Sequence, residues 1–140
     1  FFTISGSATK TIRVTKIEII GTATTAAVQN IVVYKRSTLD SAGTPITSIP
    51  HDSADAAATA VVSVYVANPA SLGTSVGQIA SHKLFLSTVT TQPSLITMLF
   101  GDRASKAIVL RGVNESLCLN YSTGTNAGNA ISISVEFIEE

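Results

Sequence analysis

Near its end the chain reads Ile131-Ser132-Ile133-Ser134-Val135-Glu136-Phe137, in which apolar and polar side chains alternate. Successive side chains of a β-strand point to opposite faces, so this pattern predicts a strand with one face in a core and the other in solvent. Ser and Thr make up a quarter of the chain, Ile and Val together outnumber Leu and Met, and no long stretch has helical spacing. The sequence therefore predicts an all-β protein.

An earlier stretch of the same kind changes phase along its length. Its apolar residues occupy even positions at Ile12 and Val14 but odd positions at Ile17 and Ile19. Because a shift of one residue moves side chains to the other face, the apolar face stays inward only if a bulge or bend absorbs one residue. We expect that irregularity near residues 15–16, where it would let one strand serve two sheets.

Turn residues divide the rest of the chain into short extended segments without an internal repeat. We expect eight to nine strands in one domain over residues 1–140, arranged as an antiparallel β-sandwich of jelly-roll type. The expected strands are residues 2–5, 9–20, 28–34, 61–66, 76–86, 95–100, 108–111, 115–121 and 130–138.

Two segments stand out from this pattern. Residues 95–100 are apolar at nearly every position, which predicts a central strand buried on both faces. Residues 37–53 form a long Ser, Thr, Pro and Gly-containing loop, and such loops in compact domains are usually functional, ordered by a partner or flexible. Asp52 or Ser53 could cap a helical turn over residues 54–58.

Charge is scarce in this chain. Nine basic and nine acidic residues cancel, only 13% of the residues are charged, and the mean hydropathy is positive. Nucleic-acid binding normally needs a dense positive field, and no stretch is long and apolar enough for a membrane helix. A small soluble monomer usually carries more surface charge. We therefore expect no nucleic acid, no membrane, and a homo-oligomer, with a trimer favoured, that covers the apolar surface.

No set of residues indicates catalysis or a cofactor, so we expect no enzyme, no cofactor and no metal. Gly73-Thr74-Ser75-Val76-Gly77 has the letters of a nucleophile elbow, but that motif needs a following helix in an α/β fold. Cys118 is the only cysteine and lies in an apolar stretch, which favours a small buried side chain over a reactive thiol.

Two weaker site patterns remain as alternatives. His51, Asp52 and Asp55 could meet a cation, although Asp in such a loop more often caps a turn. Three tyrosines could form a sugar-stacking platform if they share a face, which makes a carbohydrate-binding module a rival function. These tyrosines are Tyr34, Tyr65 and Tyr121.

Several stretches along nearly the whole chain carry a resemblance to a known group of proteins. They are Thr9-Lys10-Thr11-Ile12-Arg13-Val14-Thr15-Lys16-Ile17, Pro50-His51-Asp52-Ser53, Ala57-Ala58-Thr59-Ala60, Ala67-Asn68-Pro69, Leu72-Gly73-Thr74, Ala107-Ile108-Val109-Leu110-Arg111-Gly112 and Ser134-Val135-Glu136-Phe137-Ile138-Glu139-Glu140. In these the chain resembles small β-rich virion proteins of tailed bacteriophages, such as capsid decoration, cement or minor structural proteins.

The resemblance implies a structural role on the capsid surface, where β-sandwich subunits, often in symmetric oligomers, clamp neighbouring coat proteins. The expected partners are the major capsid protein or other virion proteins, and a tail, neck or fibre component is the nearest alternative. Contacts between subunits are expected from the N-terminal segment and the long loop. The residues expected to make them are Phe1, Phe2, Ile4, Ile46 and Ile49.

Overall fold

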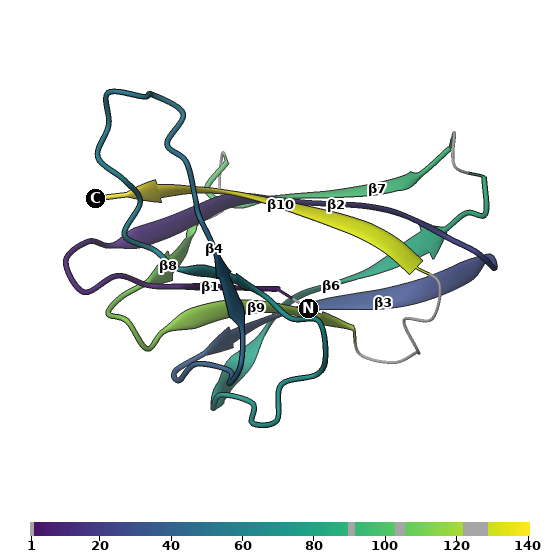
Figure 1. Cartoon of the computed structure of the whole chain (residues 1–140), viewed down its shortest axis with the longest axis horizontal. Coiled ribbons are helices and arrows are strands. Elements are labelled where there is room, and N and C mark those ends of the chain that lie inside the picture. Colours follow the sequence, from purple (N-terminus) through teal and green to yellow (C-terminus); the bar gives the residue numbers. More distant parts are fainter. Residues whose placement is uncertain (1, 90–91, 103–105, 122–128) are drawn as a thin grey trace.

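The computed structural model describes residues 2–89, 92–102, 106–121 and 129–140, and in these residues it contains strands and no helix. Ten strands form two antiparallel sheets that face each other (Figure 1). Sheet A has the order β4-β5-β1-β9-β3-β6, and sheet B has the order β10-β2-β7, with β8 also paired to β2. The prediction of an all-β sandwich is confirmed.

The strand bounds follow the predicted segments closely. Sheet A consists of β1 (Phe2–Ser5), β3 (Ala27–Arg36), β4 (Thr44–Ile46), β5 (Val62–Val64), β6 (Ser75–Leu86) and β9 (Ser116–Tyr121). Sheet B consists of β2 (Ile12–Ala23), β7 (Ser94–Leu99), β8 (Ile108–Leu110) and β10 (Asn129–Glu139). The jelly-roll assignment is not confirmed, because that fold divides eight strands between two sheets and sheet A alone has six in the described residues.

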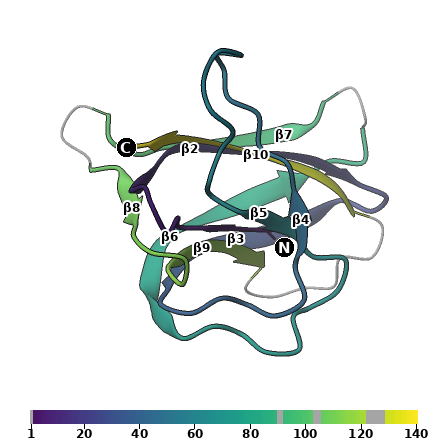
Figure 2. The ribbon, with the colours of Figure 1, turned by 60° about the vertical axis from the view of Figure 1, so that its left-hand side comes forward.

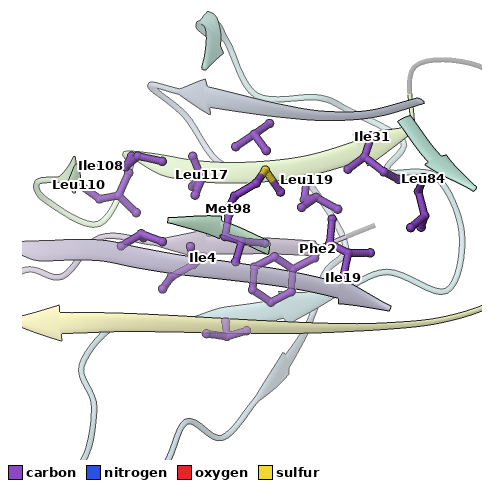
Figure 3. Close-up of a cluster of buried hydrophobic side chains, with 14 of the residues drawn as sticks. Phe2, Ile4, Ile19, Ile31, Leu84, Met98, Ile108, Leu110, Leu117 and Leu119 are labelled. Atoms are coloured by element: carbon purple, nitrogen blue, oxygen red, sulfur yellow. The ribbon is translucent and has the colours of Figure 1, made fainter. Parts of the chain in front are cut away.

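The core lies between the two sheets. Figure 3 shows Leu117 and Leu119 of β9 pointing toward the strands of sheet B, where Ile19 and Met98 meet them. The inner residues of β10 are half-buried against this core, as the alternation predicted. Full burial of one such aliphatic side chain is worth about 1.5–3 kcal/mol, so this layer supplies most of the stability.

The predicted irregularity in β2 is a bulge at Thr15. In the ladder with β10, Glu136 pairs with Lys16 and Phe137 pairs with Val14, so Thr15 is the extra residue. The hydroxyl of Thr15 donates a hydrogen bond to the carbonyl oxygen of Glu136 at 3.1 Å. The bulge lets Val14 and Ile17 both face the core, and both are completely buried. The whole of β2 stays in sheet B, so the strand does not serve two sheets.

Three local predictions were wrong. β7, predicted to be a central strand, lies at the edge of sheet B and exposes Leu95 and Leu99. The apolar sequence of a strand does not specify which other strands lie beside it. The predicted loop contains the short strand β4, in which Pro45 is tolerated because the strand lies at the edge of the sheet. Residues 54–58 form no helical turn, although Asp52 does cap a turn there.

Candidate interaction groove

A large groove runs along the C-terminal part of β10. It has a volume of about 770 Å³ and lies between residues 133–139 of β10 and the chain that connects β4 to β5. We call this connecting segment, residues 47–61, the arm, and the depression the β10 groove. Phe2 of β1 and Val62 of β5 also line the groove.

The arm projects from the sandwich and returns to it. It leaves β4, passes the C-terminal end of β10, extends beyond sheet B and then enters β5 (Figures 1 and 2). Near its tip the backbone N–H of Ala54 donates to the Asp52 carboxylate at 2.9 Å, and the N–H of Asp55 donates to the Asp52 carbonyl at 3.1 Å. The tip is therefore an Asx-type turn, which accounts for Asp52.

The returning end of the arm is fastened to β10 by Glu139. The backbone N–H groups of Thr59 and Ala60 donate to Oε1 of Glu139, both at 2.8 Å, and the Thr59 hydroxyl donates to Oε2 at 2.9 Å. Lys10 Nζ lies 3.3 Å from the same Oε2. Burial raises the pKa of Glu139, but the hydrogen bonds from Ala60, Thr59 and Lys10 outweigh it and the pKa is lowered overall.

The expected contact residues fall into two groups. Ile49 is 82% exposed and Ile46 is 48% exposed, and both line the β10 groove. Phe2 is only 4% exposed and belongs to the core, where its side chain also meets the groove. Ile4 lies on β1, between β5 and β9 in sheet A, and its side chain is completely buried in the core, so the chain itself covers it. Phe1 lies outside the described residues.

The candidate cation ligands do not converge. Within residues 2–89, 92–102, 106–121 and 129–140, no group of three His, Cys, Asp or Glu side chains could hold a metal ion. His51 and Asp55 line the groove, whereas the carboxylate of Asp52 is engaged by the backbone of the turn. Glu136, which also lines the groove, lies 3.0 Å from Lys16 Nζ.

A buried polar cluster on the outer face of sheet A is the second concentration of chemically interesting groups. Arg36 Nη1 donates to the carbonyl of Gly73 at 2.6 Å, and the N–H of Gly73 donates to Oδ1 of Asp40, also at 2.6 Å. Arg36 Nε lies 3.2 Å from the same Asp40 oxygen. These bonds fasten residues 37–43 and 71–74 to the sheet.

The same cluster surrounds Cys118. Its side chain is completely buried, and burial raises the pKa of the thiol to about 12. A thiol is nucleophilic as its thiolate, so this environment suppresses its reactivity. The expectation that Cys118 is a buried side chain is confirmed.

The other predicted site residues are dispersed. Tyr121 packs against the core, whereas Tyr34 lies beneath the guanidinium of Arg36, 5.8 Å from the ring centre. Tyr65 approaches Thr3, with 3.3 Å between the two hydroxyl oxygens. The three tyrosines thus form no common platform. Ser75 begins β6, and no helix follows it in the described residues.

Sequence reasoning missed Glu139 and the unpaired edge of β10. A signal for Glu139 was present, because the alternation that places Ile133, Val135 and Phe137 toward the core also places residue 139 on that face. A charged residue at such a position needs a partner. Nothing in the sequence indicated that the arm would supply it.

No family model, no curated protein and no solved structure matches this chain. Among the described residues there is also no helix that could span a membrane.

Proposed function

We propose that this protein is a structural virion protein of a tailed bacteriophage, a capsid decoration or cement protein that binds across neighbouring coat subunits. It would act as a homo-oligomer on the capsid surface and stabilise the shell by burying protein surface, without carrying out a reaction. The proposal rests on the sequence resemblance together with the surface of the molecule. A tail, neck or fibre protein would use the same surfaces at a lower copy number.

The observation that carries the proposal is the amount of large apolar side chain left exposed on several faces. Ile49 on the arm is 82% exposed, and Phe85 and Val76 on β6 are each 63% exposed. Leu95 and Leu99 of β7 are also more than half exposed. Together with the low charge content, such surfaces favour extensive contact with other proteins.

The arm supports the same role by its position. It extends beyond sheet B, so a neighbouring subunit can reach it without disturbing the core (Figure 2). Ile49 lies at its outgoing end and Ile46 ends the adjoining strand β4, and both are exposed. The buried Ile4 takes no part in these contacts.

The experiment that tests this function has two steps. Sedimentation velocity of the purified chain is expected to give a discrete closed oligomer, with a trimer favoured. Cosedimentation with heads assembled from the coat protein of the same genome is then expected, and replacing Ile46 and Ile49 by Ser should weaken it at least tenfold. Ser48→Ala, on the same arm, is the matched control. A chain that stays monomeric and binds neither heads nor tails contradicts the proposal.

A further inference from the structure

The free edges of the two sheets differ in how well they resist pairing with another strand. In sheet A, β6 carries two irregularities in its ladder with β3, with Ile79 and Val76 as the extra residues, and β4 is short and contains Pro45. Bulges, prolines and short length are the usual means by which natural proteins block edge strands. β10 is eleven residues long and contains no proline or lysine. It also carries no bulge of its own, because the extra residue in its ladder lies on β2.

The backbone of β10 offers hydrogen-bonding groups to the β10 groove. The N–H and C=O groups of Glu140 are both bonded to Thr11 beside β2, at 3.0 and 2.7 Å. Because these groups alternate in direction along a strand, Ile133, Val135 and Phe137 direct theirs away from β2. In the described structure β10 pairs with β2 alone.

The residues that line the groove also indicate that it lies along the free edge of β10. Seven consecutive residues of β10, from residue 133 to residue 139, border it. Residues of both faces are therefore included, which places the groove along the edge of the strand and not over one of its faces. Seven strand residues span about 23 Å, enough for an extended peptide of similar length.

The charges and the opposite wall restrict what can occupy the groove. Ile49 and Pro50 of the arm make part of that wall apolar. The charged residues of the lining are Lys10, Asp55, Glu136 and Glu139, one positive and three negative. Lys10 forms an ion pair with Glu139, and Lys16 forms one with Glu136, so the excess negative charge of the lining lies with Asp55. An occupant with a basic side chain would complement it.

We propose that the β10 groove binds an extended peptide segment of another protein, which adds as a strand to the free edge of β10. The segment carries apolar side chains at alternate positions and a Lys or Arg that faces Asp55. This is recognition by strand addition, in which backbone hydrogen bonds give affinity and side chains give specificity. It rests on the proposed assembly function, because it names the kind of partner that the arm and β10 would hold.

The test uses a library of nine-residue peptides with Val, Ile or Thr at alternate positions and Lys or Ser between them. Saturable binding by fluorescence anisotropy is expected for members with a central Lys, together with amide exchange protection at residues 133, 135 and 137. N-methylation of the edge-facing amides of the best peptide should weaken binding at least tenfold, and Asp55→Asn should weaken it several-fold. Equal binding of the N-methylated peptide, or protection elsewhere, overturns the proposal.

Variants of the protein provide an independent check. Val135→Pro removes a backbone N–H that faces the groove and should abolish peptide binding. The variant should still fold, because proline is tolerated where the N–H of an edge strand is unpaired. Ile49→Ser removes apolar surface from the exposed wall without adding charge, and it should weaken binding even if Val135→Pro fails to fold. Ser132→Ala, on the outer face of β10, is the control.

If no library peptide binds while the chain still sediments with heads, strand addition is wrong and the assembly function stands. If a peptide binds but the chain does not bind particles, the assembly function is wrong and strand addition stands.

Discussion

Glu139 of β10 holds Thr59 of the arm with both of its carboxylate oxygens. Oε1 accepts the backbone N–H of Thr59 at 2.8 Å, and Oε2 accepts its hydroxyl at 2.9 Å. The Thr59 hydroxyl also lies 2.8 Å from the hydroxyl oxygen of Ser7, which precedes β2. One carboxylate thus joins the returning end of the arm to sheet B, while the tip remains exposed.

Glu139→Gln is expected to loosen the arm without unfolding the sandwich. The amide keeps one acceptor for the backbone of Thr59 and Ala60 but loses the charge that Lys10 faces. Hydrogen bonds to charged groups are worth about 1.5–3 kcal/mol, so we expect a loss of about 1–2 kcal/mol. Urea unfolding measures the loss, and amide exchange should become faster at residues 59–60. Unchanged exchange there would mean that other contacts hold the arm.

The same carboxylate predicts how the arm responds to acid. The pKa of Glu139 is lowered from 4.5 in the folded chain, so its contribution is fully present above pH 4.5 and is lost as the pH falls through the folded pKa. The difference in Tm between the native chain and Glu139→Gln should therefore be constant above about pH 6 and vanish in stronger acid. Glu140→Gln, whose partner Arg13 is exposed, is the control. A difference that persists at pH 2 contradicts this assignment.

The sequence was informative where a pattern is local. Alternation in β10 and the phase change in β2 predicted a half-buried strand and a bulge, because both follow from the two-residue period of the backbone. β7 was misjudged because Leu95 and Leu99 are apolar yet uncovered. Which strand occupies an edge depends on the order of the sheet, and that order is set by pairing between distant segments.

The candidate groove was predictable only in part. The long loop and the exposed Ile46 and Ile49 were identified from composition, since such a loop with apolar residues favours contact with partners. The free edge of β10 is a property of the assembled sheet, because any strand with this sequence could equally lie between two neighbours. The position of Glu139 against Thr59 likewise depends on the path of the arm.

Asp40→Asn is expected to be far more damaging than its size suggests. Its carboxylate is the counterion of Arg36, and both side chains are almost completely buried. Removing one partner of a buried ion pair leaves an uncompensated charge and typically costs about 3–5 kcal/mol. The amide still offers an oxygen to the N–H of Gly73, so the loss reports mainly on the charge.

Equilibrium urea unfolding measures this effect, and Glu18→Gln is its control. Glu18 lies 3.1 Å from Lys16 Nζ on the exposed face of sheet B, where an ion pair contributes about 0–1 kcal/mol. Similar small losses for both variants would indicate that Arg36 finds another partner or reaches solvent. A large loss of stability for Asp40→Asn alone would support the interpretation that the polar cluster holds residues 37–43 against sheet A.

The reactivity of Cys118 reports directly on whether the Arg36–Asp40 cluster and the residues it holds over sheet A open in the native state. Its side chain lies on the outer face of sheet A, paired across the strands with Tyr34 and Thr3, and interacts with Arg36 and Asp40. With a pKa raised to about 12 by burial, only about one thiol in 10⁴ is ionised at pH 8. Ellman's reagent should therefore leave the native chain unmodified for hours and titrate one thiol per chain in urea. Asp40→Asn should accelerate the native reaction at least tenfold, because it releases the residues over the thiol. Rapid labelling of the native chain would instead mean that the outer face of sheet A opens without unfolding.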